Sequence, residues 1–374
     1  MAPVNPTLPL TAFKPDNADM SSGFLKIARG CIKKEQGYGP APSLIQVSDE
    51  ILPGFAGVDA LFVGTDTTSS NIYRTYAGNK SAIYEAIGTP FVWTDVSKAG
   101  GYTTQPEERW RHAQFDENVF ATNGNDPLQF VSVPAGGLYA DVGATGLPLA
   151  ARYIAVISDE HLVLGNLIAH PTLGTANNGL QWSPFRNPFG DWTDIATRSD
   201  ASLIPNVGEM TGLTGGEFGV ALFRGGVAKI NYTPGASETF QIDVVSREVG
   251  CDVPASVLQV GHLTIWWSGS GWYVYDGNQL VPIGREWVDK WTRDELRAGQ
   301  EFRIQPHYDR QTRVARWLFT GQQSQGDVPN RSLIWKPSLG QQGFSYQDID
   351  SYALGDFVPP GTNLDLNPYP TLDA

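Results

Sequence analysis

Cysteine is scarce in this sequence, and its scarcity removes two common sources of stability. Only Cys31 and Cys251 occur among the 374 residues. About 220 positions separate them, so they form neither a disulfide framework nor a CxxC metal site. Unpaired cysteines of folded proteins usually behave as small apolar side chains, and we therefore expect two buried free thiols.

The chain also lacks the apolar stretches that direct a protein into or across a membrane. Residues 1–20 have no basic region followed by an apolar one, so they do not resemble a secretory signal. No run approaches the ~18 apolar residues that a transmembrane helix needs. We expect a soluble chain that is made in a cytoplasm.

Sequence motifs of catalysis are missing as well. There is no GxSxG, Walker or GxGxxG loop. A glycosidase needs two carboxylates that converge on one sugar, and nothing marks such a pair. We predict no enzymatic activity, no catalytic residue and no cofactor, with a hydrolase whose carboxylates converge in space as the remaining enzyme alternative. The acidic pairs, all in predicted turns or at strand starts, are Glu107-Glu108, Asp116-Glu117 and Asp159-Glu160.

Metal-ligand patterns are equally weak. The histidines show neither HxH nor HExxH spacing, and all except His170 lie beside predicted turns, where an exposed or hydrogen-bonded imidazole is ordinary. Residues 123–126 (NGND) resemble the start of a calcium loop but lack the later Glu that completes one. We predict a turn with an Asn in the left-handed region, and no metal site. The five histidines are His112, His161, His170, His262 and His307.

Turn-forming and aromatic residues, in contrast, are abundant. The 41 Gly and 26 Pro are spread along the chain, which indicates many tight turns and many short strands. Eleven Trp and fourteen Tyr suit the half-buried surface of a pleated sheet. Helical periodicity is nearly absent, and residues 285–296 (REWVDKWTRDEL) are the best helix candidate. These features predict an all-β protein.

Pairs of strands joined by a short polar turn recur roughly every 40–60 residues, close to the repeat of a four-stranded propeller blade. A blade cannot bury its faces alone, but blades stacked around an axis can. We therefore predict a β-propeller of about six blades rather than a β-sandwich, which would not give this longer period. The paired strands are 58–63 with 71–76, 111–115 with 119–122, 153–157 with 161–165, 217–223 with 227–232, 258–260 with 263–267, and 307–308 with 312–319.

The two ends differ from the middle. We divide the chain into an N-terminal arm with lead-in strands (1–57), the propeller (58–357) and a Pro-rich C-terminal tail (358–374). The tail has four prolines and cannot form a central strand or a helix. We expect it to be extended and either to dock on a neighbouring subunit or to be disordered.

One aromatic cluster could serve either a core or a ligand. Trp266, Trp267, Trp272 and Tyr273 lie in two predicted strands that end on an Asp-Gly-Asn turn. Exposed, such rings could stack on sugars. Because they lie in an apolar run, we expect them in the core.

Several segments in order resemble one protein family. Together they span about residues 105–295, roughly half of the chain. The first, residues 109–115 (RWRHAQF), is followed by residues 119–129 (VFATNGNDPLQ). The others are 181–183 (QWS), 187–188, 191–193 (DWT), 215–219 (GGEFG), 250–251 (GC), 256–261, 271–277 (GWYVYDG), 282–284 (PIG) and 288–289.

The chain is thereby similar to the tail nozzle or hub proteins of short-tailed bacteriophages, also called packaged-DNA stabilisation proteins. The resemblance implies a β-propeller that assembles into a ring, usually a homohexamer, below the portal and its adaptor. Such a ring continues the double-stranded DNA channel without specific binding, and it carries tail spikes or fibres. The implied localisation is the virion tail, assembled in the host cytoplasm. The main alternative is a receptor- or glycan-binding propeller at the tail tip.

The net charge of −13 gains a meaning from this resemblance. Lysine and arginine on the wall of a DNA channel would add affinity for phosphate, whereas an acidic wall repels it. From Pro337 onward the chain has five Asp and no Lys or Arg. We expect a lumen rich in Asp and Glu, and the alternative is that the charge only maintains solubility.

Overall fold

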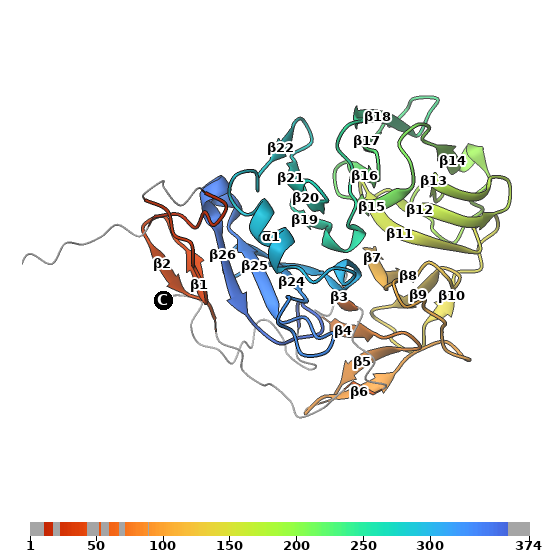
Figure 1. The fold of residues 1–374 in the computed structure, drawn as a ribbon. Helices are drawn as coiled ribbons and strands as arrows, with labels where there is room; N and C mark the ends of the chain where they lie inside the picture. The colour runs from red at the N-terminus through yellow and green to blue at the C-terminus, as the bar shows by residue number, and fades with distance from the viewer. Residues whose placement is uncertain are drawn as a thin grey trace, which may run out of the picture. The chain divides into compact units, whose positions relative to one another are not determined.

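The described residues of this protein form six four-stranded sheets (Figure 1). The structure is a computed structural model that describes residues 11–17, 23–42, 52–53, 60–66, 72–88 and 90–357. Within each sheet the strands follow one another in chain order, and neighbours are antiparallel. This repeated four-stranded meander is that of a six-bladed β-propeller, and the prediction of the fold class is confirmed.

The chain divides into two compact units. The four-blade unit comprises Gln46–Pro254 and Ala353–Ala374, and the two-blade unit comprises Met1–Ile45 and Ala255–Tyr352. The blades of the first unit are β3 (Ala60–Thr65), β4 (Tyr73–Gly78), β5 (Ile83–Ile87) and β6 (Val92–Asp95); β7 (Arg111–Phe115), β8 (Asn118–Thr122), β9 (Gln129–Ser132) and β10 (Ala140–Asp141); β11 (Ala150–Ile157), β12 (His161–His170), β13 (Gly174–Trp182) and β14 (Asp200–Leu203); and β15 (Met210–Thr214), β16 (Gly219–Phe223), β17 (Gly226–Tyr232) and β18 (Phe240–Ser246). A short 3-10 helix, η1 (Ile195–Thr197), precedes β14.

The two-blade unit holds the remaining sheets and the only α-helix of the described residues. Its blades are β19 (Leu258–Val260), β20 (Leu263–Ser268), β21 (Gly271–Tyr275) and β22 (Leu280–Pro282), and β23 (Gln305–Asp309), β24 (Val314–Phe319), β25 (Arg331–Trp335) and β26 (Phe344–Asp348). It also contains the hairpin β1 (Cys31–Lys33) and β2 (Tyr38–Pro40), the helix α1 (Asp289–Glu295), and the 3-10 helices η3 (Glu301–Arg303) and η4 (Pro337–Gly343). A further 3-10 helix, η2 (Pro254–Ser256), lies where the two units join in sequence.

The first strand of each blade is its innermost strand. In the four-blade unit, β3 contacts β7, β7 contacts β11 and β11 contacts β15; in the other unit, β19 contacts β23. Among the described residues, the fourth strand of each blade pairs with the third, and only β26 also pairs through its backbone with a further segment, residues 28–30, along its outer edge. Four of the outer strands, β6, β10, β14 and β22, have only two to four residues, which limits unwanted pairing with other chains.

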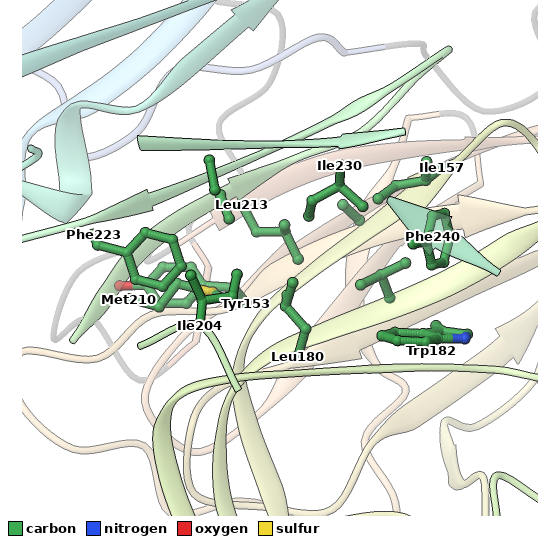
Figure 2. Close-up of a cluster of buried hydrophobic side chains, with 14 of the residues drawn as sticks. Tyr153, Ile157, Leu180, Trp182, Ile204, Met210, Leu213, Phe223, Ile230 and Phe240 are labelled. Carbon is green, nitrogen blue, oxygen red and sulfur yellow. The ribbon is translucent and has the colours of Figure 1, made fainter. Parts of the chain in front are cut away.

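The core lies between blades. Figure 2 shows one such cluster, where side chains from β11–β14 meet side chains from β15–β18. Trp182 and Phe240 meet edge to face with ring centroids 5.1 Å apart, and Met210 and Phe223 are fully buried. Each such side chain contributes about 1.5–3 kcal/mol on burial, so the blades stabilise one another rather than themselves.

The helix is shorter than the predicted 285–296. Glu286 has φ +62°, a left-handed conformation that interrupts a right-handed helix. The helix begins only at Asp289, and its first free amides are bound from elsewhere: the Asp16 carboxylate accepts from Lys290 N at 2.7 Å and from Trp291 N at 2.8 Å. Among the described residues, no helix is long and apolar enough to cross a membrane.

The described part of the N-terminal arm docks on its own chain. Phe13 is fully buried and contacts the rings of Trp291 and Tyr346 at centroid distances of 5.8 and 5.6 Å. Farther along, Gly30 N donates to the Tyr346 carbonyl at 2.7 Å, so the segment runs along edge strand β26. The predicted tail, 358–374, lies outside the described residues.

Two predictions about buried residues have mixed outcomes. Cys251 is buried, as expected, but Cys31 is only half-buried because it begins the small hairpin β1–β2. The cluster of tryptophans on β20 and β21 is in the core, as expected, while Tyr273 beside it is half-buried. The aromatic side chains are therefore structural, and they offer no open stacking platform.

Candidate functional site

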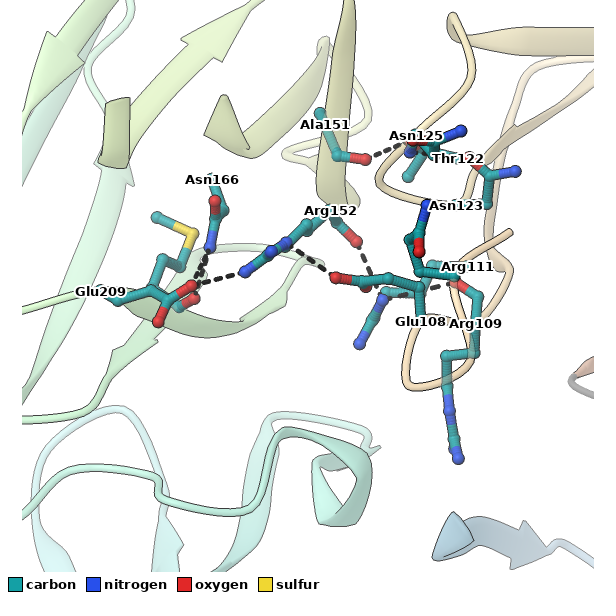
Figure 3. A network of polar contacts seen from close by, with 12 residues as sticks. Glu108, Arg109, Arg111, Thr122, Asn123, Asn125, Ala151, Arg152, Asn166 and Glu209 are labelled. Carbon is teal, nitrogen blue, oxygen red and sulfur yellow. Dashed lines mark hydrogen bonds and ion pairs between the residues drawn. The ribbon is translucent and has the colours of Figure 1, made fainter. Parts of the chain in front are cut away.

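A polar network lies where three blades of the four-blade unit meet (Figure 3). Several of its residues come from the segment 109–129, one of those that the sequence analysis singled out. That segment forms β7, β8 and the turn that follows. Its polar residues contact both the turn itself and the neighbouring blade.

The turn after β8 is held by Asn123. The side-chain oxygen of this fully buried residue accepts from Asn125 N at 3.0 Å and from Asp126 N at 2.8 Å, and its amide donates to the Asp126 carboxylate at 2.7 Å. The left-handed residue is Gly124, with φ +77°, and not an Asn as predicted. A Cβ on Gly124 would lie 3.2 Å from the Glu108 carboxyl carbon, so glycine also makes room for the network.

Arg152, on β11, is the centre of the network. Its Nε lies 2.8 Å from Glu108 Oε1, just before β7, and its Nη1 lies 2.5 Å from Glu209 Oε1, just before β15. The second oxygen of Glu209 contacts Arg224 Nε at 3.3 Å. Asn166 donates to Glu209 Oε1 at 3.2 Å, and Figure 3 shows this amide and Arg152 converging on the same carboxylate.

Backbone contacts strengthen the same junction. Arg111 Nη1 donates to the Arg152 carbonyl at 3.1 Å, and its guanidinium lies over the Tyr153 ring at 4.4 Å. Gly124 N donates to the Ala151 carbonyl at 3.1 Å, and the Thr122 hydroxyl donates to the same oxygen. The junction therefore joins blades β7–β10, β11–β14 and β15–β18 through both side chains and main chain.

This arrangement braces the structure and offers no reactive group. Glu209 accepts a charge-assisted hydrogen bond from Arg152, and Glu108 forms an ion pair with the same guanidinium, so both carboxylates are engaged by a cation. Glu108 and Glu209 are 16% and 26% exposed, and Arg152 is 36% exposed. A partly shielded network of ion pairs and hydrogen bonds of this kind holds neighbouring elements in register.

The other acidic pairs stay in their predicted turns and meet different partners. Glu160 contacts Arg186 at 2.5 Å on the surface, far from the partner of Glu108. Asp116 takes a left-handed φ of +50° in the turn between β7 and β8. The pKa of the Arg186 guanidinium is raised chiefly by its hydrogen bonds to Glu160 and also by the nearby charge of Asp116, whereas Glu108 pairs with Arg152.

The histidines are scattered. His161 Nδ1 lies 2.7 Å from the Ser183 carbonyl, a hydrogen-bonded state as predicted, and His262 is exposed. His112 differs from the prediction: it lies within β7, its ring stacks on Phe62 at 5.2 Å, and desolvation lowers its pKa to about 4. In the part of the chain that the structure describes, no group of His, Cys, Asp and Glu side chains could hold a metal ion.

The sequence analysis singled out Glu108 but missed its partners. Glu108 and Arg152 come from different blades, and Glu209 from a third. No local spacing links them, because only blade packing brings them together. The signal that could have suggested the network is positional: all three lie at or just before the first strand of their blade.

Comparisons with known proteins add distant structural neighbours. No family model and no curated protein matches the chain. Similar solved structures include "Crystal Structure of Mitotic Checkpoint Complex" (TM-score 0.43, 10% identity, 84% of this chain and 91% of the other). Others are the extracellular domain of the putative one-component system BT4673 from B. thetaiotaomicron (0.44, 13%, 91% and 40%) and "YCF48 bound to D1 peptide" (0.43, 11%, 79% and 82%). At TM-scores below 0.5, no role is transferred from them.

Proposed function

We propose that this chain is a structural virion protein, one subunit of a phage tail nozzle or hub. In this role it forms a ring, a homohexamer, that continues the DNA channel below the portal and its adaptor. The ring helps retain packaged DNA and carries spikes or fibres on its outside. It belongs to the virion tail, is assembled in the host cytoplasm and catalyses no reaction.

The proposal rests on the segments that resemble the phage family, because their tryptophans are buried and hydrogen-bonded within the propeller. Trp110 is 2% exposed, and its indole donates to the Asn79 carbonyl at 2.9 Å across to the neighbouring blade. Trp192 is 1% exposed and donates to Pro188 O at 2.9 Å. Asn123 organises the turn beside the network. Residues with these roles stabilise the packing and the turns of the blades. This is what we expect of a structural component of a channel.

The sequence of the innermost strands limits where an acidic lumen can lie. In the four-blade unit the innermost strands β3, β7, β11 and β15 contain Arg111 and Arg152 but no Asp or Glu. The residues that make the whole chain acidic therefore lie outside these four strands. We propose that they line the bore made by several copies together and not the inner strands of a single propeller. A positive electrostatic potential over the bore of the assembled ring would contradict this.

Electron microscopy of the purified protein and of intact particles tests the proposed role. We expect rings coaxial with the tail, immediately below the portal and adaptor, in particles labelled through a tag on this chain. A peripheral trimer at the tail tip would contradict the ring and support the receptor-binding alternative. That alternative no longer has its suggested stacking platform, because Trp266, Trp267 and Trp272 are buried.

A further inference from the structure

A pocket of about 410 Å³ lies on the four-blade unit, away from the arginine network. It is formed by β13, η1, β14 and the turn between β17 and β18. Trp182 and Phe240, each 5% exposed, form its floor, and Ile195, 71% exposed, stands at its edge. Its volume falls within the range of about 300–1,000 Å³ typical of small-molecule sites.

Arg198 is held at this pocket in an unusual conformation. It ends η1 with φ +70°, a position that normally favours glycine or asparagine. Its carbonyl accepts from the Trp182 indole and from the Thr239 hydroxyl, both at 2.9 Å, so two blades hold its backbone in place. Its guanidinium makes one longer hydrogen bond, to Ala236 O at 3.3 Å, and no ion pair among the described residues includes it.

The rest of the lining supplies acceptors and hydroxyls. Asp200 and Glu238, both exposed, line the pocket together with serine and threonine side chains. Asp200 Oδ1 accepts from Ala201 N at 2.7 Å, which leaves its second oxygen available. Donors and acceptors therefore surround a small aliphatic wall formed by Ile195 and Ile242.

We propose that this pocket binds a neutral saccharide unit. A sugar ring presents hydroxyl groups that both donate and accept, matching Arg198, Asp200 and Glu238, and carbon faces that match Ile195 and Ile242. An anion is disfavoured because two carboxylates accompany the one arginine. A purely apolar ligand would bury the charged side chains without hydrogen bonds, which is unfavourable. This site goes beyond the ring and does not depend on it.

Saturation-transfer NMR with the full chain tests the proposal. The probes are neutral hexoses, 6-deoxyhexoses and N-acetylhexosamines, with an uncharged acetylated tripeptide and inorganic phosphate for comparison. We expect signal transfer to at least one sugar and at least a tenfold loss of affinity in Arg198→Gly. Glycine accepts the left-handed conformation of residue 198, so this variant removes the guanidinium while keeping the backbone. Glu238→Gln, which keeps the side chain's size, should weaken binding as well.

Arg186→Gly is the matched control. Arg186 also has a positive φ, +50°, and lies outside the pocket lining, so its replacement should leave sugar affinity within twofold of the wild type. Thermal melting establishes that each variant is folded. The proposal is overturned if no sugar binds, if Arg198→Gly binds as the wild type does, or if only the peptide or phosphate binds. These readings use the isolated protein, so they are separate from the failure or success of ring formation.

Discussion

At the scale of single residues, Arg152 is the cation that two carboxylates share, those of Glu108 and Glu209. Replacing it with alanine leaves Glu108 and Glu209 facing a junction without their shared cation. Because Arg152 is about one-third exposed, solvent screens part of the loss, and we expect the free energy of unfolding to fall by about 1–2 kcal/mol. Urea unfolding followed by tryptophan fluorescence measures this.

Arg224→Ala is the control for that change. Arg224 contacts the same Glu209 but is 57% exposed, so its loss should cost at most about 0.5 kcal/mol. Adding Glu108→Gln to the Arg152→Ala variant should recover part of the stability, because Glu108 has lost its ion-pair partner whereas Glu209 keeps Arg224. If the two arginine variants unfold alike, the network does not brace the blades.

The carboxyl group of Asp289 makes the stability of the folded protein depend on pH. Its pKa is raised to about 6, chiefly by burial and also by the negative charge of Asp16, against the lowering effect of a hydrogen bond from Trp272 N. A carboxyl whose pKa is higher in the folded state favours folding when protonated. Its favourable contribution is therefore complete below the unfolded pKa of about 4 and is lost as the pH rises through about 6.

We therefore expect Asp289→Asn to be more stable than the wild type at pH 7.5, by about 1 kcal/mol after allowance for solvent screening. At pH 4 the two proteins should differ much less. Melting temperatures between pH 4 and 8 measure the difference, with Asp294→Asn, on the exposed side of the same helix, as the control. A constant difference at every pH would show that Asp289 does not titrate in this range.

At the scale of elements, the sequence predicted inner hairpins better than outer strands. The strand pair 111–115 and 119–122 matches β7 and β8 closely, because an apolar pattern flanks a polar turn. The outer strands β6, β10 and β14 are short and mostly exposed, so no alternation marks them. Strand β12 runs on to His170 through two irregularities near Asn166 and Ala169, whose left-handed conformations the sequence does not reveal.

The N-terminal segment is an element whose contribution can be measured. Phe13 is fully buried against Trp291 and Tyr346, so Phe13→Ala should lower the free energy of unfolding of the two-blade unit by about 3 kcal/mol. Hydrogen exchange at the amide of Tyr346, which donates to Ala28 O at 3.0 Å, should become faster. Phe24→Ala, at a side chain that is 40% exposed, should change stability far less. Unchanged exchange at Tyr346 would mean that the docking of this segment does not depend on Phe13.

At the scale of the whole molecule, the sequence indicates the period of the blades but not the polar network between them. The period follows from turns and apolar strands, which are local features. The junction at Arg152 depends on which blade packs against which, and the pocket at Arg198 depends on a left-handed residue between two blades. Both sites arise from packing between blades, so sequence spacing alone cannot reveal them.

Ring assembly is the property in which the C-terminal tail should matter. The last described residue, Phe357, packs on Phe91 at 5.0 Å, next to the turn between β5 and the outer strand β6. Phe357, where the described chain ends, therefore lies near the outer edge of that blade, where Val92 is 46% exposed. The described N-terminal segment already packs on its own chain, which leaves the tail as the better candidate for contacts between subunits.

We expect deletion of residues 358–374 to leave the melting temperature unchanged but to reduce ring formation and incorporation into particles several-fold. A variant whose tail is replaced by a Gly/Ser segment of equal length should behave like the deletion, since length alone supplies no contacts. Normal ring formation and particle incorporation by both variants would rule out a role for the tail in assembly.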